Sequence, residues 1–262
     1  MLQTRRAGAL TSWGTAYLLG QASLDDADTA TVGSDSVHRV SGVPGEPDPV
    51  PVAIALGRLR AHGLTGFRLV LPEPGDPTGL PGPASFTAPA VAAGSAVVGV
   101  GPADVPSLAL LPTTARVDGA GDVVRWDVVA VDHVIAPAGL PTLSEADRGL
   151  ADAMAASTAE LAALDVARGR DDVAGRLRML ERALRDVDLP PTLPARAQRL
   201  VATATRLLGV LDIAAETDGA ALTAAEALRR SAALRPLRTA ARYALCAAYS
   251  AAAEGGASSL RR

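Results

Sequence analysis

Polar side chains that could bind a ligand gather in the proline- and glycine-rich segment 71–91, LPEPGDPTGLPGPASFTAPAV. Prolines and glycines at this spacing predict successive tight turns, and long loops of preset shape often carry binding function. Carboxylate and hydroxyl groups there could hold a small molecule through hydrogen bonds. The competing interpretation is structural cover over the edge of a sheet. The candidate ligand-binding residues are Glu73, Asp76, Thr78, Ser85 and Thr87.

Composition excludes several classes of enzyme. The chain has no lysine, so all 25 basic residues are arginine, and Schiff-base, P-loop and lysine general-base chemistry are ruled out. The single cysteine, Cys246, has no second cysteine to pair with, and no serine lies in a G-x-S-x-G elbow. We therefore expect no cofactor, no metal and no catalytic residue of a familiar type, and a non-enzymatic role is favoured. The three histidines lack metal-binding spacing: His38, His62 and His133.

Three arginines near the carboxyl terminus fall on one face of a predicted helix. Arg235, Arg238 and Arg242 are separated by three and four residues, the spacing that aligns side chains along a helix. In a chain without lysine, arginine-rich faces are expected by default. The carboxyl-terminal half is only slightly basic, so a partner protein is favoured over nucleic acid as the ligand of this candidate surface.

A small mixed sheet is predicted in the amino-terminal half. Strands are expected at 37–40, 66–72, 95–100 and 107–112 because short apolar runs are bounded there by turn residues. A hairpin follows, with its turn at Asp118-Gly119. On its return strand one face is wholly apolar, which places Trp126 in the core and makes the sheet at least partly antiparallel: Val124, Trp126, Val128 and Ala130.

Segment 71–91 is flanked by two predicted strands, so it is interpreted as a stiff insertion within one sheet. Thr87 is expected to cap a short helix with Pro89 in its first turn. The boundary between halves then lies downstream, near 141–144. Three other helices are predicted in the amino-terminal half, around 10–18, over 23–31 and over 52–62. The second of them begins with a capping-box pattern at Ser23 and Asp26.

The carboxyl-terminal half has a helical hydrophobic period throughout. A capping box at Ser144 and Asp147 predicts a helix to about 168, and further helices are expected over 173–187 and from Pro194 onward. Pro236 is expected to divide the last segment into helices over 223–234 and 236–253. The fold class is therefore α+β, with a mixed sheet and helices in 1–141 and a bundle of about five helices in 142–262, as separate domains or one packed unit.

Two strings, RLVLPEPGDPTGLPGPASF and ALRRSAALRPL, resemble segments of a protein family of high-GC actinobacteria that has no known function. The resemblance implies a bacterial, cytoplasmic protein and assigns no activity. The lone cysteine fits a reducing compartment, and the longest uncharged run is too rich in proline and glycine to form a membrane helix.

From the sequence we expect a non-enzymatic cytoplasmic protein of interaction or regulation that acts through a helical face. Its partner would be another protein or a second copy of itself, and no membrane is involved. The alternative is a small-molecule-binding protein or enzyme with a site near the loop 72–87. A nucleic-acid-associated protein is the third possibility.

Overall fold

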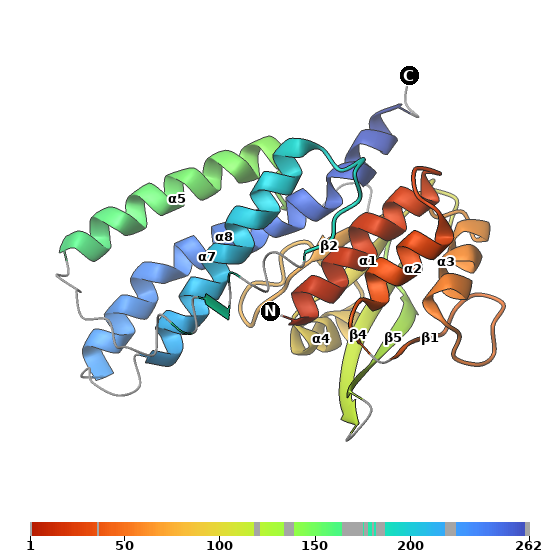
Figure 1. Ribbon diagram of the computed structural model, residues 1–262, viewed down its shortest axis with the longest axis horizontal. Coiled ribbons are helices and arrows are strands. Elements are labelled where there is room, and N and C mark those ends of the chain that lie inside the picture. The colour runs from red at the N-terminus through yellow and green to blue at the C-terminus, as the bar shows by residue number, and fades with distance from the viewer. Residues whose placement is uncertain are drawn as a thin grey trace. The chain divides into compact units, whose positions relative to one another are not determined.

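The computed structural model describes residues 2–35, 37–117, 121–133, 139–163, 175, 178–179, 181, 187–217 and 224–259. The chain forms two compact units. Figure 1 colours the chain by residue number, from red at the amino terminus to blue at the carboxyl terminus. The first unit comprises residues 1–140, 188–194 and 249–262, and the second comprises 141–187 and 195–248. Two short segments that the sequence pattern assigned to the helical region therefore belong to the first unit.

The first unit contains one five-stranded mixed sheet of order β1-β5-β4-β3-β2, so the predicted α+β class with an amino-terminal sheet is confirmed. β1 runs parallel to β5, and every other neighbouring pair is antiparallel. The strand bounds are β1 Val37–Ser41, β2 Gly66–Val70, β3 Ala96–Val100, β4 Leu108–Val117 and β5 Gly121–Ala130.

The hairpin of β4 and β5 is confirmed, although its predicted turn residues, 118–119, lie outside the described part of the chain. The prediction of a separate strand ending at Pro112 is wrong, because β4 runs through this proline. β3 pairs with β4 only at Ala109 and Leu110, so Pro112 lies beyond the part of β4 that has strands on both sides. A proline is tolerated there because fewer ladder hydrogen bonds depend on its missing N–H.

Helices cover both faces of the sheet (Figure 1). On one face lie α1 (Leu2–Leu18), α2 (Leu24–Val32) and α3 (Val52–Ala61), over the apolar face of β5 that the sequence predicted. Trp126 is fully buried there, as expected, although Ala130 at the strand end is exposed. The predicted start of α2 at Ser23 is confirmed, because the hydroxyl of this N-cap residue accepts a hydrogen bond from the N–H of Asp26 at 3.0 Å.

Segment 71–91 joins the adjacent antiparallel strands β2 and β3, so the predicted insertion within one sheet is confirmed. Its helix α4 (Ala84–Ala93) covers the second face of the sheet through the buried side chains of Phe86 and Ala90. The predicted cap is wrong: Pro83 is the N-cap residue, while Thr87 and Pro89 lie inside the helix. The segment is a cover over a sheet face, and Leu80 packs into the same apolar cluster.

The exposed edge of β2 is closed by hydroxyl groups. The N–H of Phe67 donates to the Oγ1 of Thr15 at 2.9 Å, and the N–H of Leu69 donates to the Oγ of Ser250 at 3.0 Å. Thr15 lies on α1, and Ser250 lies in the last part of α8 (Ala224–Ser259). Because an edge strand with unpaired N–H groups invites pairing with another chain, these two bonds protect the sheet from extension.

Close packing at α1 gives a testable consequence. A Cβ atom at Gly8 would lie 2.6 Å from the buried ring of Tyr249, whereas one at Gly57 in α3 would meet nothing within 4 Å. We expect Gly8→Ala to lower the free energy of unfolding by about 1–3 kcal/mol, because the ring has no free space to move into. Gly57→Ala should raise it by up to about 1 kcal/mol through helix propensity. Chemical denaturation, monitored by tryptophan fluorescence, would give the free energy of unfolding of both variants. Stabilisation by both substitutions would contradict the close packing of Gly8 against Tyr249.

Three helices are described in the second unit: α5 (Leu143–Ala163), α7 (Ala195–Thr217) and the first part of α8. The predicted helix over 173–187 lies mostly outside the described residues. The predicted break at Pro236 is wrong, since α8 continues through it. Leu237 and Ala241 are buried just beyond the proline, and this packing offsets the cost of the missing backbone hydrogen bond.

The capping box of α5 is displaced by two residues from its predicted position at Ser144 and Asp147. Thr142 donates its N–H to the carboxylate of Glu145 at 2.9 Å, and the N–H of Glu145 points back to the Oγ1 of Thr142 at 3.4 Å. Thr142-x-x-Glu145 has the same residue pattern as the predicted pair, and the predicted position is wrong because α5 begins at Leu143, directly after Thr142.

Candidate functional site

Charged side chains meet inside the first unit, around the guanidinium group of Arg6. This group forms two parallel hydrogen bonds of 2.6 Å with the carboxylate of Asp35, and its Nη2 also lies 2.8 Å from the Oδ2 of Asp122. Its Nη1 donates to the Oγ1 of Thr114 at 3.0 Å. Only 6% of the Arg6 side chain is exposed, so two carboxylates compensate one buried positive charge.

His38 extends this network into the core. Its Nε2 lies 2.9 Å from Asp35, and its Nδ1 accepts a hydrogen bond from the indole Nε1 of Trp126 at 3.3 Å. Since Nδ1 accepts, Nε2 carries the proton, and the ring is neutral. Burial lowers the pKa of His38 and outweighs the hydrogen bond to Asp35, which acts to raise it. Burial acts to raise the pKa of Asp35, but hydrogen bonds from Arg6 and His38 prevail and lower it.

A histidine beside an aspartate could act as a catalytic general base or could be a structural part of a buried network. The surroundings of His38 decide between these two roles. Both ring nitrogens are occupied, and the side chain has no exposed surface. A general base needs one nitrogen within reach of a substrate proton. The network therefore joins α1, β1, β4 and β5, and its histidine is not accessible to a substrate.

The five polar candidates of the proline-rich loop lie on two features, a tight turn and the helix α4. Glu73 and Asp76 close a tight turn by reciprocal backbone hydrogen bonds of 3.1 and 2.9 Å. The Oδ1 of Asp76 also accepts from the N–H of Thr78 at 3.3 Å. Ser85 is exposed and Thr87 half-buried, both on α4.

The three candidate arginines of α8 have different surroundings. Arg235 is exposed. The Nη1 of Arg238 lies 2.7 Å from the Oδ1 of Asp212 on α7. Arg242 is buried, with its guanidinium carbon 5.7 Å from the centre of the Tyr243 ring. The helical spacing is as predicted, but of the three arginines only Arg235 is exposed.

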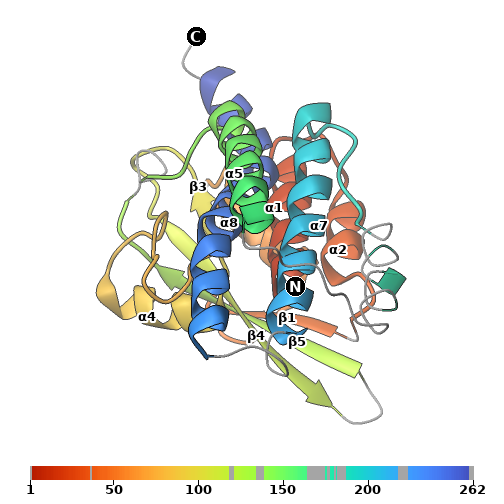
Figure 2. The same ribbon diagram turned by 90° about the vertical axis from the view of Figure 1, so that its left-hand side faces the viewer.

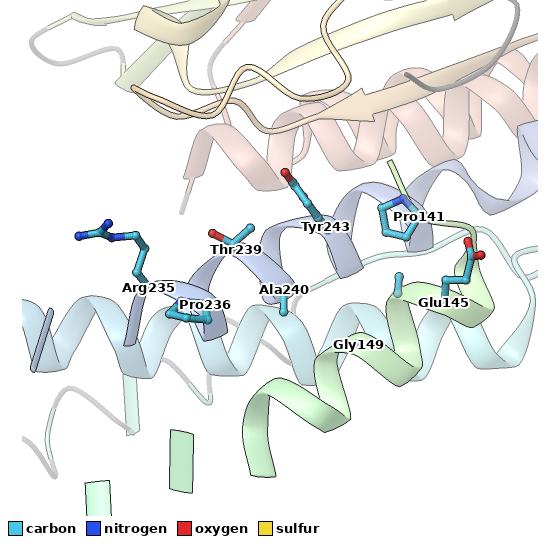
Figure 3. A pocket seen from close by; sticks show the side chains of 9 residues that line it. Pro141, Glu145, Gly149, Arg235, Pro236, Thr239, Ala240 and Tyr243 are labelled. Atoms are coloured by element: carbon cyan, nitrogen blue, oxygen red, sulfur yellow. The ribbon is translucent and has the colours of Figure 1, made fainter. Parts of the chain in front are cut away.

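A groove lies within the second unit, between the start of α5 and the middle of α8 (Figure 3). Its volume is about 460 Å³, within the range of ligand pockets, and it is open to solvent. Figure 3 shows Arg235 and Glu145 at opposite ends of the groove. The lining residues are Pro141, Glu145, Ala146, Gly149, Arg235, Pro236, Thr239, Ala240 and Tyr243.

The two charged ends of the groove differ in how far their charge is already satisfied. The Oε2 of Glu145 accepts hydrogen bonds from the N–H and the hydroxyl of Thr142, at 2.9 and 2.7 Å, and these bonds lower the pKa of Glu145. Between the ends, Pro236 has no N–H to donate to the carbonyl group one turn earlier in α8. The groove therefore presents apolar walls, a positive charge at the Arg235 end and a few hydrogen-bonding groups.

Sequence reasoning missed both the buried network and the groove. The groove combines residues about 90 positions apart in the chain, with no motif that links them. Within the described residues, no three His, Cys, Asp or Glu side chains are close enough to hold a metal ion. No helix in this part of the chain is both long enough and apolar enough to cross a membrane.

Comparisons with known proteins cover nearly the whole chain. Residues 7–142 match the family model described as Rv1486c-like protein, N-terminal domain, and residues 144–246 match the model of the C-terminal domain. Two relatives are "Uncharacterized protein Rv1486c" and "Uncharacterized protein MT1533" of two Mycobacterium tuberculosis strains, H37Rv and CDC 1551. Each is 29% identical over 93% of this chain and 95% of its own length. The comparison with solved structures yields no match.

Proposed function

The chain belongs to the family of Rv1486c-like proteins, which confirms the resemblance read from its sequence, and we propose that it is a non-enzymatic, cytoplasmic interaction protein. In this proposal a partner protein binds in the groove between α5 and α8. The observation that carries it is the groove itself, with apolar walls and one exposed arginine at its end. Concave apolar sites of this kind accept the anchoring side chains of partners.

The lining of the groove defines the chemistry of the partner. Ala146, Gly149 and Ala240 have small side chains, which leave room for a large apolar side chain of the partner. Arg235 favours a carboxylate next to that side chain, because a guanidinium group binds carboxylates in a bidentate manner. Glu145 already accepts hydrogen bonds from its own helix cap, so it contributes less to the choice of partner.

The two other functions considered have less support. A small-molecule site at the loop 72–87 would need its polar groups to converge, and Asp76 and Thr78 instead bond within the turn. A nucleic-acid surface would need several exposed arginines together, whereas Arg238 is paired with Asp212 and Arg242 is buried. The lone cysteine, Cys246, is buried as well, which fits a protein that needs no disulfide in a reducing compartment.

Filling the groove tests the proposal. Peptides are first selected from a random library for binding to the wild-type protein. We expect them to bind the Ala240→Trp variant at least about tenfold more weakly than wild type, because loss of an anchoring contact costs about 1–2 kcal/mol of binding free energy or more. The matched control is Val210→Trp, at an exposed position of α7 outside the groove. Fluorescence anisotropy would give the affinities, and circular dichroism would confirm folding of both variants.

The selected sequences themselves carry a second readout. An apolar residue next to Asp or Glu is expected among them, and Arg235→Glu should weaken these peptides while leaving neutral ones unchanged. Equal affinities for wild type, Ala240→Trp and Val210→Trp would overturn the groove as the binding site. A metabolite that raises the melting temperature of wild type but not of Ala240→Trp would assign the groove to a small molecule instead.

A further inference from the structure

One end of the sheet has a face that the described helices of the first unit leave open. Helix α4 and Leu80 cover the part of this face formed by β2, β3 and the start of β4. Farther along, Thr113 and Ala115 of β4 and Arg125 of β5 are exposed on the same face. In Figure 2 this is the outer side of the strands labelled β1, β4 and β5, opposite α1 and α2.

The strand register aligns three side chains in a row on this open face. Arg39 of β1 lies directly beside Arg125 of β5, and Thr113 of β4 is the neighbour of Arg125 on its other side. The next residues along the strands, Val40 and Trp126, are buried on the opposite face. Because side chains alternate along a strand, the two arginines and the threonine must point to solvent. The Arg125 side chain is 62% exposed.

Arg39 and Arg125 are the only neighbours of like charge in the described register of the sheet. Like charges directly opposite one another destabilise a sheet. The Nε of Arg125 donates to Asp127 at 2.9 Å, so the pair has one carboxylate for two guanidinium groups. Among the described residues of the first unit, the row therefore keeps an excess of positive charge, in contrast to Arg6 with its two carboxylates.

We infer that Arg39, Arg125 and Thr113 form a binding site for the phosphate group of a small molecule. Guanidinium groups bind phosphate oxygens through two parallel hydrogen bonds, and a threonine hydroxyl donates a further one. A ligand with close to two negative charges also removes the repulsion between the arginines. This site lies in the first unit and is independent of the proposed groove, so each can fail without the other.

Thermal unfolding in inorganic phosphate and in sodium chloride of equal ionic strength tests this site. Both tryptophans, Trp13 and Trp126, lie in the first unit, so their fluorescence reports its melting. Phosphate is expected to raise the melting temperature of wild type above its value in chloride. Arg39→Gln should melt at a higher temperature than wild type in chloride, because the repulsion is gone, and should lose the phosphate effect.

Arg58→Gln is the matched control, because Arg58 is also an exposed arginine of the first unit and pairs with Glu46. It should keep the full phosphate effect, and Arg125→Gln should lose it. Adenosine monophosphate serves as a second probe. If it raises the melting temperature as much as phosphate does, the site recognises the phosphate group alone. If it raises the melting temperature further, the site also recognises the rest of a phosphorylated metabolite. No rise in wild type with either probe, or an unchanged rise in Arg39→Gln and Arg125→Gln, would overturn the site.

Discussion

Arg6→Met is expected to lower the free energy of unfolding of the first unit by about 3 kcal/mol. Removing one member of a buried ion pair costs about 3–5 kcal/mol, because the remaining charge stays in the interior without compensation. Here the remaining charges are Asp35 and Asp122, whose side chains are 13% and 23% exposed. Partial contact with water lowers the cost, so we place the effect at the lower end of that range.

Urea denaturation followed by tryptophan fluorescence measures this loss, since both tryptophans belong to the first unit. The matched control is Arg58→Met, which removes a surface ion pair with Glu46. Because the Arg58 side chain is 54% exposed, its loss should cost less than about 1 kcal/mol. Equal losses in both variants would show that Arg6 acts through its aliphatic packing and that its charge is of minor importance.

Stability of the first unit is expected to fall as the pH drops below about 6.5, the ordinary pKa of histidine. In the folded state burial lowers the pKa of His38, so the ring remains neutral while the unfolded chain takes up a proton. The unfolded state then binds more protons, and the free energy of unfolding decreases by up to about 1.4 kcal/mol for each pH unit. The loss ends once the pH reaches the lowered pKa of the folded state.

The neighbours of His38 explain why protonation is resisted and define the control. A proton on Nδ1 would oppose the indole N–H of Trp126, which is 3.3 Å away. His38→Gln removes this titrating group, so its free energy of unfolding should fall less steeply than that of wild type as the pH drops from about 6.5 to about 4.5. His62→Gln alters a histidine outside this network and should keep the wild-type slope. An unchanged slope in His38→Gln would assign the pH dependence to other groups.

The strands were largely predictable because short apolar runs between turn residues mark them locally. The direction in which His38 points was not predictable, since β1 has valines at both alternating positions, Val37 and Val40. The register against β5 settles the question by placing His38 and Val40 on the same side as Val124 and Trp126. Register is a property of the partner strand and of the whole sheet, so it does not appear in a local pattern.

The candidate sites show the same limit. Helical spacing correctly placed Arg235, Arg238 and Arg242 along one helix, but their exposure depends on what α7 and the neighbouring turns of α8 bring against them. The polar residues of the loop 72–87 were identified by type alone. Their hydrogen bonds within the turn, such as that from the N–H of Thr78 to Asp76, follow from backbone geometry that residue type does not specify.

Sealing the edge of β2 has a consequence for how the protein is made. Thr15 lies in the first of the two regions matched by the family models, whereas Ser250 follows the end of the second. While the ribosome is still producing the helical unit, the N–H of Leu69 has no Ser250 to donate to, and the half-closed strand edge stays open to other chains. Vectorial synthesis therefore leaves the sheet unprotected until the final turns of α8 emerge, and a fragment ending near residue 140 would carry that open edge permanently.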